Sequence, residues 1–91
     1  MRRVVWSPDA ASDLDELRRY IADFNPAAAM RFSIRLRAAA ESLSEFADRG
    51  RPGPLGTREL AIVKPYLVRY AVVAEEVLVI SIRHGARRSE P

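Results

Sequence analysis

Two consecutive segments carry apolar residues at alternating spacings of three and four, the period of one face of an α-helix. The apolar positions are Ala10, Leu14, Leu17, Ile21 and Phe24 in residues 8–24, and Ala29, Phe32, Leu36, Ala39, Leu43 and Phe46 in residues 26–48. Ser7-Pro8 and Asn25-Pro26 precede them, each a capping residue followed by a proline suited to the first helical position. The sequence therefore predicts two helices with almost no linker, which form an antiparallel hairpin.

Short segments with a period of two predict strands on either side of this hairpin. Residues 3–6 form an N-terminal strand, whose pairing the pattern leaves open, and residues 50–56, rich in Gly and Pro, form a loop. Residues 57–63, 66–73 and 77–84 then form a three-stranded antiparallel meander, because the turns between them are short. The predicted fold class is α+β with two layers, in a single domain over residues 1–91.

Alternation along the last two strands predicts which face packs on the hairpin. We expect the apolar sets to face it: Tyr66, Val68, Tyr70 and Val72 in the middle strand, and Leu78, Ile80 and Ile82, with His84 at the end, in the last strand. The opposite faces, which carry Arg69, Ser81 and Arg83, should then look outward and leave the sheet with a basic surface.

Composition narrows the possible chemistry. The chain has no cysteine, which excludes disulfides and thiolate nucleophiles, and a single histidine, His84, so we expect no metal and no cofactor. It contains no Gly-rich phosphate-binding motif and no nucleophile turn. No apolar run approaches the roughly 20 residues of a membrane span, and the N-terminal residues lack signal-peptide features, so we expect a cytoplasmic protein.

Charge is unevenly distributed along the chain. Residues 1–50 carry eight Arg and eight Asp or Glu, whereas residues 51–91 carry seven Arg or Lys and four Glu, so the net charge of +3 arises there. Lys64 is the only lysine, and arginine suits bidentate pairing with carboxylates and phosphates. The partner could therefore be an acidic protein segment or a nucleic acid, although the codon usage of a GC-rich genome would also account for the arginines.

The basic end of the last strand is the remaining candidate site. It comprises Arg83, His84 and Arg87, with Arg69 on the neighbouring strand. On a functional interpretation, Arg69 and Arg83 form an anion site on the open sheet face, and His84 exchanges a proton near neutral pH. On a structural interpretation, the strand end is merely solubilising and His84 lies at the edge of the core.

The order of elements and several local motifs resemble the RelE/ParE toxin superfamily. The motifs are Trp6-Ser7-Pro8, Asn25-Pro26, Gly50-Arg51-Pro52-Gly53-Pro54, Tyr66-Leu67-Val68-Arg69-Tyr70 and Arg83-His84-Gly85-Ala86-Arg87, and together they extend over nearly the whole chain. The resemblance implies an intracellular toxin that a cognate antitoxin holds inactive.

The resemblance favours the ParE-like branch of this superfamily. RelE-like members cut messenger RNA in the ribosome, with an arginine near the start of the middle strand and a cationic residue after the last; here these positions are Leu67 and Gly85. ParE-like members inhibit DNA gyrase by binding and are neutralised by a ParD-like antitoxin, so we expect both as partners and no sequence-specific DNA binding by this chain alone. The residues assigned to target or antitoxin binding are Arg58, Arg69, Arg83, His84 and Arg87, and none is assigned to catalysis.

Two alternatives remain open at the level of sequence. One is a ribosome-dependent endoribonuclease that uses Arg58, Arg69, Arg83 and His84 in a rearranged site. The other is a non-toxic relative that acts only as a binding partner.

Overall fold

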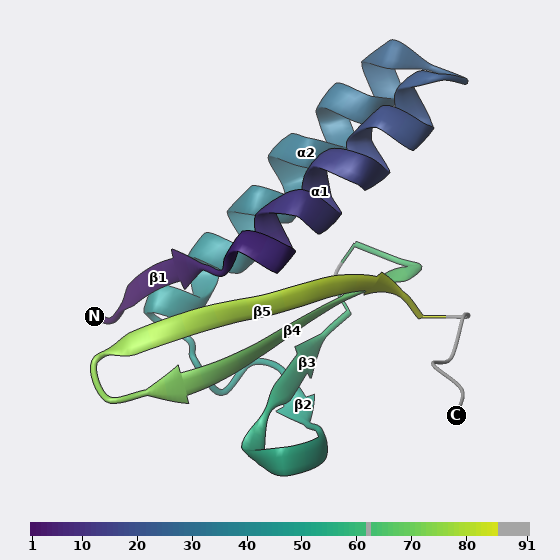
Figure 1. Cartoon of the computed structure of the whole chain (residues 1–91). Helices are drawn as coiled ribbons and strands as arrows, with labels where there is room; N and C mark the ends of the chain where they lie inside the picture. The colour runs from purple at the N-terminus through teal and green to yellow at the C-terminus, as the bar shows by residue number, and fades with distance from the viewer. Residues whose placement is uncertain (62, 86–91) are drawn as a thin grey trace.

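The computed structural model describes residues 1–61 and 63–85. In chain order the elements are β1 (Arg3–Trp6), α1 (Pro8–Ala22), α2 (Pro26–Glu41), the 3-10 turn η1 (Ser42–Ser44), β2 (Arg51–Pro52), the 3-10 turn η2 (Pro54–Gly56), β3 (Arg58–Leu60), β4 (Tyr66–Val73) and β5 (Glu76–His84). The two helices form a hairpin above a sheet, as Figure 1 shows, so the α+β fold class and its two layers are confirmed.

Both helices begin where the sequence predicts. The Ser7 hydroxyl accepts a hydrogen bond from the Ala10 amide at 3.0 Å, and the Asn25 side chain accepts one from the Ala28 amide at 3.0 Å. Each cap satisfies a backbone donor of the first turn that has no partner within the helix.

Both helices end before the predicted residues. α1 stops at Ala22 and α2 at Glu41, so Phe24 and Phe46 lie outside them and are 76% and 58% exposed. The prediction that these two phenylalanines extend the buried stripes is therefore wrong. A residue beyond the end of a helix can continue the spacing of three in the sequence, but its side chain no longer points to the buried face of that helix.

Within the described residues the sheet has five strands in the order β1-β5-β4-β3-β2. β3, β4 and β5 form the predicted antiparallel meander, although β3 covers only Arg58–Leu60 rather than residues 57–63. β1 pairs in parallel with β5, with Val4 opposite Val77, which fixes the pairing that the sequence left open. The sequence predicts residues 50–56 as a loop, but the structure has a short strand there: β2 pairs with β3 through Arg51 and Pro52. The prediction that the whole segment is loop is therefore wrong.

A β-bulge lies in β5 at Ile80. Arg69 of β4 is opposite Ser81, but the next residue, Tyr70, is opposite Val79. The hydroxyl of Ser7, at the start of α1, donates to the Ile80 carbonyl oxygen at 2.9 Å. The side chain of Ser7, the N-cap of α1, therefore anchors the bulged segment of β5 to this helix.

The bulge changes which residues of β5 face the helices. Val77, Val79 and Ile82 are buried, whereas Leu78 and Ile80 are only partly so. The predicted inner face is therefore wrong for Leu78 and Ile80 and correct for Ile82. One extra residue reverses the alternation of a strand, and period-two analysis of the sequence cannot detect that reversal.

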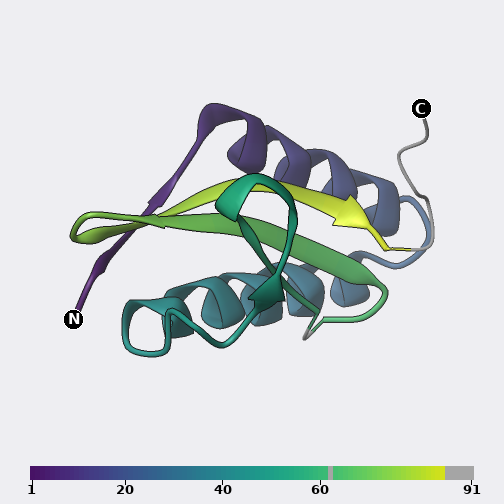
Figure 2. The ribbon, with the colours of Figure 1, turned by 90° about the horizontal axis from the view of Figure 1, so that it is seen from below.

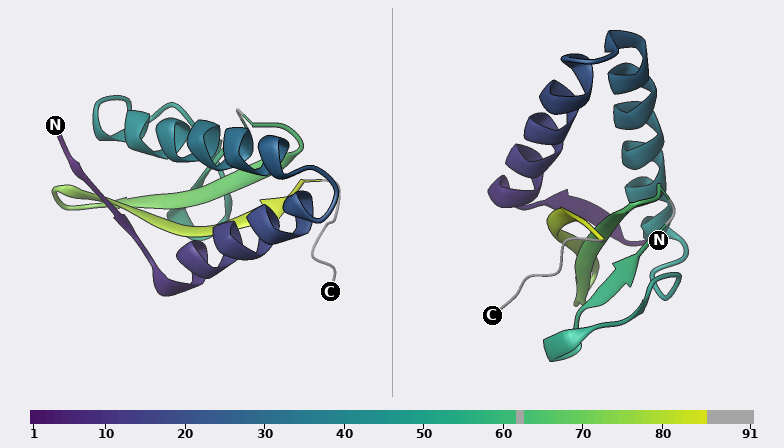
Figure 3. Two further views of the ribbon diagram at one scale, coloured as in Figure 1. Left: turned by 90° about the horizontal axis from the view of Figure 1, so that it is seen from above. Right: turned by 90° about the vertical axis from the view of Figure 1, so that its right-hand side faces the viewer.

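The core lies between the hairpin and one face of the sheet. Figure 3 shows these two layers from two directions. It contains Ala10, Leu14, Phe32, Leu36, Ala39, Ala40, Leu43, Leu60, Val63, Val68, Tyr70, Val77, Val79 and Ile82. Figure 2 shows the other sheet face, which neither α1 nor α2 covers and in front of which the β2–β3 loop passes. Among the described residues, no helix has the length and apolar character needed to cross a bilayer.

Replacing Leu36 with alanine tests the position of the core. Leu36 is fully buried, whereas Ile34 on the same helix is 62% exposed. We expect Leu36→Ala to lower the free energy of unfolding by about 2–5 kcal/mol because it leaves a cavity. Ile34→Ala should lower it by less than about 0.5 kcal/mol. Chemical denaturation measures both, and equal losses in the two variants would contradict this packing.

Candidate binding site

Arg69 and Arg83 lie on the open sheet face, as the sequence predicts. Arg69 is opposite Ser81 across β4 and β5, and Arg83 is opposite Leu67. These four residues share a face because cross-strand partners point the same way. The two arginines are therefore diagonal neighbours on the sheet surface.

Arg69 is engaged by a carboxylate within the sheet. Its guanidinium donates to the Glu59 carboxylate at 2.5 Å across β3 and β4, and the two side chains are only 24% and 17% exposed. A partly buried pair of this kind largely neutralises the arginine, and removing one partner would leave the other charge uncompensated. The sequence does not reveal Glu59 as a partner, because its position opposite Arg69 depends on the β3–β4 register.

Arg58 faces the opposite side of the sheet and binds backbone. It is the cross-strand partner of the buried Tyr70, and its guanidinium donates to the carbonyl oxygens of Gly50 at 2.6 Å and Asp48 at 3.3 Å. An open pocket of about 460 Å³ adjoins it, lined by Arg2, Glu45, Ala47, Asp48, Arg58 and Val72. Arg58 thus holds the segment between η1 and β2 while it lines this pocket.

Tyr70 fixes the same segment from inside the core. Its side chain is fully buried, and its hydroxyl donates to the Ala47 carbonyl oxygen at 2.7 Å and accepts from the Gly50 amide at 2.8 Å. A Cβ at Gly50 would lie 2.8 Å from the Tyr70 ring and from the Glu59 carbonyl oxygen, so only glycine fits there. Tyr70 lies on the inner face, as the alternation along the strand predicts, but that alternation does not indicate the partners of its hydroxyl.

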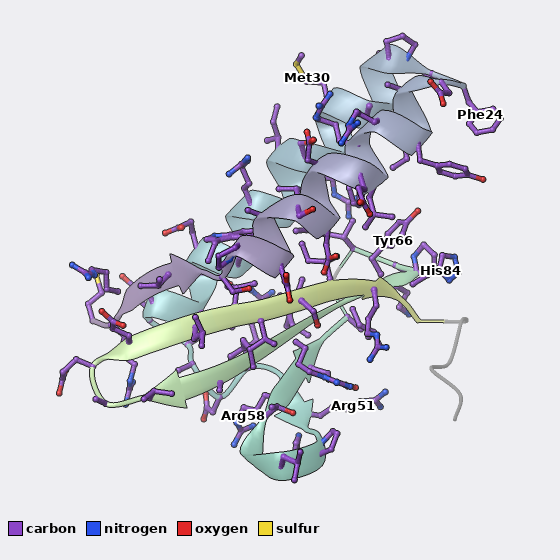
Figure 4. The ribbon with its side chains drawn as sticks, in the orientation of Figure 1. Phe24, Met30, Arg51, Arg58, Tyr66 and His84 are labelled. Atoms are coloured by element: carbon purple, nitrogen blue, oxygen red, sulfur yellow. The ribbon has the colours of Figure 1, made fainter. Side chains whose placement is uncertain are left out.

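His84 lies on the hairpin side of the sheet, away from Arg69 and Arg83. Its ring meets that of its cross-strand partner Tyr66 edge-on at 5.4 Å, and Tyr66 meets Phe32 of α2 edge-on at 5.0 Å. Figure 4 shows Tyr66 and His84 together at the end of β5. This position agrees with the structural interpretation of His84 as a residue at the edge of the core.

The four candidate residues that the structure describes therefore do not form one cluster. Arg69 and Arg83 share the open face, while His84 lies against Tyr66 on the hairpin side and Arg58 shares a face with the buried Tyr70. Figure 4 shows Arg58 beside β2 and β3, well separated from His84. Arg87 lies outside the described residues.

Leu67 and Gly85 occupy the two positions where RNA-cutting relatives are expected to carry cationic side chains. Leu67 lies on the open face opposite Arg83. The Gly85 amide donates to the Pro65 carbonyl oxygen at 2.6 Å, and a Cβ at Gly85 would come within 2.9 Å of that oxygen. A side chain at position 85 would thus require the backbone at Pro65 to move.

Comparison with known proteins agrees with this architecture of a small two-layer domain. Residues 4–89 match the family described as ParE toxin of type II toxin-antitoxin system, parDE. The chain is 46% identical to Toxin RelE2 of Caulobacter vibrioides, over 96% of this chain and 99% of that protein, and 34% identical to Putative toxin Y4kP of Sinorhizobium fredii, over 92% and 88%.

A solved structure of the chromosomal ParDE system from P. aeruginosa superposes with a TM-score of 0.82 at 25% identity, covering 92% of this chain and 96% of that one. The chain therefore belongs to the ParE toxin family and is the toxin component of a type II toxin–antitoxin system. Membership of this family implies an antitoxin partner.

Removing the Tyr70 hydroxyl tests its structural role. Tyr70→Phe leaves the Ala47 carbonyl and the Gly50 amide without their partner, so we expect the free energy of unfolding to fall by about 1–3 kcal/mol. Tyr66→Phe is the matched control, since the Tyr66 hydroxyl has no hydrogen bond within the described residues, and it should change stability by less than about 0.5 kcal/mol. Thermal unfolding of both variants measures the difference. A Tyr70→Phe protein as stable as the wild type would show that the hydroxyl contributes nothing to the fold.

Proposed function

We propose that this toxin inhibits DNA gyrase by binding it, rather than by cleaving RNA. The observation that supports the proposal is the separation of the candidate catalytic groups. Cleavage of RNA needs a base beside the 2′-hydroxyl and cationic groups near the scissile phosphate, all within reach of one substrate. His84 and Arg69 lie on opposite faces of the sheet, and Glu59 neutralises Arg69.

The positions of Leu67 and Gly85 support the same proposal. Loss of one positioned donor to a developing charge costs an enzyme about 3–4 kcal/mol of transition-state stabilisation. Leucine donates no hydrogen bond from its side chain, and the backbone at Pro65 leaves no room for a side chain at position 85. Binding imposes no such requirement, because it depends on a complementary surface alone.

In this mechanism the toxin acts in the cytoplasm without metal or cofactor. The proposed binding residues are Arg58, Arg69, Arg83, His84 and Arg87. Arg83 lies on the open sheet face, while Arg58 and Arg69 act mainly by holding the segment between η1 and β2 and the sheet in shape. A ParD-like antitoxin neutralises the toxin.

The second candidate function is ribosome-dependent cleavage of messenger RNA. Its support is that relatives 46%, 33% and 35% identical to this chain carry the names Toxin RelE2, Toxin RelE3 and Toxin RelE1. For Arg69 to act on a substrate, its pair with Glu59 would have to open, and Arg58 and His84 would still lie on the other face of the sheet.

Two assays on the purified toxin separate these functions. We expect the toxin to inhibit supercoiling of relaxed plasmid by gyrase, and to leave messenger RNA intact on translating ribosomes. Toxin mixed with its antitoxin is the control and should be inactive in both assays. Codon-specific cleavage on the ribosome with unimpaired supercoiling would replace the gyrase proposal with the nuclease.

Substitutions in β5 test the mechanism in cells. We expect His84→Gln to remain toxic, since glutamine keeps a polar group of similar reach and no proton transfer is required. Arg83→Glu should reduce toxicity sharply, because charge reversal turns attraction to an anionic partner into repulsion. Growth after induction is the measurement, and circular dichroism of each purified variant verifies folding. A folded, non-toxic His84→Gln protein beside a fully toxic Arg83→Glu protein would support the nuclease instead.

A further inference from the structure

Four charged side chains, two of each sign, line the open pocket beside β3. They are Arg2, which precedes β1, Glu45 and Asp48, which follow η1, and Arg58 of β3. None of the four forms an ion pair with any described residue. Opposite charges that line one pocket of about 460 Å³ without pairing with each other are available to a ligand.

Hydrogen bonds hold the backbone walls of this pocket. The Arg2 amide donates to the Ser44 carbonyl oxygen at 2.9 Å, which ties the start of β1 to η1. The hydroxyl of the buried Tyr70 donates to the Ala47 carbonyl oxygen at 2.7 Å, which ties the segment after η1 to β4. The pocket is therefore formed before a ligand arrives, and a preformed site avoids part of the ordering cost of binding.

The Arg58 guanidinium keeps one edge free. Its Nη1 atom supplies both bonds to the backbone, at 2.6 Å to the Gly50 carbonyl oxygen and at 3.3 Å to that of Asp48. No described residue accepts a hydrogen bond from its Nε or Nη2 atom. These two nitrogens form an edge of the guanidinium that binds a carboxylate through two parallel hydrogen bonds. The backbone thus orients Arg58 and leaves a carboxylate-binding edge available.

The acids and the apolar residues of the pocket suit the other parts of a small zwitterion. Glu45 and Asp48 are exposed, and their carboxylates can accept hydrogen bonds from the three N–H donors of an ammonium group. Ala47 is partly buried and Val72 is 38% exposed, so the lining also has an apolar portion. Pockets of roughly 300–1,000 Å³ that combine apolar lining with a few polar groups are typical of small-molecule sites.

We propose that this pocket binds a small zwitterion with an apolar side chain, either a free α-amino acid or a short peptide with free termini. The ligand carboxylate binds the free edge of Arg58, with Arg2 as the second cation. The ligand ammonium group binds Glu45 and Asp48, and the ligand side chain packs on Val72. The inference goes beyond the proposed function and is independent of gyrase as the target.

The balance of charges argues against ligands of a single sign. Phosphate or a nucleotide would be attracted by the two arginines and repelled by Glu45 and Asp48. A divalent cation would be repelled by Arg2 and Arg58, and no three described residues gather as ligands for a metal ion. A ligand that carries both charges is attracted by all four groups, and repulsion of the others makes the site selective.

The test is a titration of the purified full-length toxin, followed through the chemical shifts of its backbone amides. The probes are L-valine and the tripeptide Ala-Val-Ala with free termini. Matched probes lack one charge or both: isovalerate has no ammonium group, isobutylamine has no carboxylate, and the acetylated and amidated tripeptide has neither. Inorganic phosphate is the purely anionic probe.

We expect both zwitterions to shift the amides around the pocket at millimolar concentration. The matched probes and phosphate should bind at least about tenfold more weakly, because each loses charge-assisted hydrogen bonds or meets a like charge. The zwitterion with the lower dissociation constant identifies the source of the ligand, a free amino acid or a short peptide.

Variants of the toxin locate the site. Glu45→Gln/Asp48→Asn removes two charges with side chains of the same shape, and Arg58→Lys removes the carboxylate-binding edge but keeps a donor for the backbone. We expect each to weaken zwitterion binding by roughly 10- to 100-fold. Glu16→Gln/Asp23→Asn is the matched control, since both acids are exposed and outside the pocket, and it should change the dissociation constant by less than about threefold. Circular dichroism verifies that each variant is folded.

Any of three results would overturn this site. They are the absence of shifts with both zwitterions at millimolar concentration, equal binding of phosphate or of the acetylated and amidated tripeptide, and an equal loss of affinity in the control variant. The second result would indicate an anion or a segment of another protein as the occupant instead. Because the titration uses the toxin alone, a failed supercoiling assay would overturn the gyrase proposal and leave this one standing.

Discussion

The β-bulge at Ile80 determines where the charged residues of the sheet lie. Before the bulge, β5 turns Val77 and Val79 toward the helices, and after it the inner positions pass to Ile82 and His84. Ser7 holds the bulge at the Ile80 carbonyl, and the Asp13 carboxylate of α1 accepts from the Ile82 amide at 2.9 Å. The same helix that covers the sheet therefore fixes its register.

The bulge also separates the groups that a nuclease would have to combine. If β5 kept a regular alternation from Val77 onward, His84 would lie on the open face with Arg69. With the bulge, His84 packs against Tyr66 on the hairpin side and leaves the open face to Arg83 and the Arg69–Glu59 pair. One inserted residue thus places His84 and Arg69 on opposite faces of the sheet.

The arginines of this chain fall into two groups, according to whether other groups of the protein bind them. Arg58 and Arg69 bind groups of the sheet and of the adjoining loop, so they contribute to structure. Arg31 and Arg35 stand on the outer side of α2, where a partner can reach them. The sequence made Arg58 and Arg69 candidates for binding a partner, yet the neighbours of each arginine determine whether its charge is available.

Local signals in the sequence determined the elements and their order. Capping pairs fixed the start of each helix, and periodicity located the buried row from Ala10 to Leu43, because both depend on neighbours within one or two turns. Only the tertiary structure decided the parallel pairing of β1, the bulge, β2 and the contacts of Glu59 and Tyr70. These features join residues far apart in the chain, so their geometry depends on strand register, which alternation of side chains leaves undetermined.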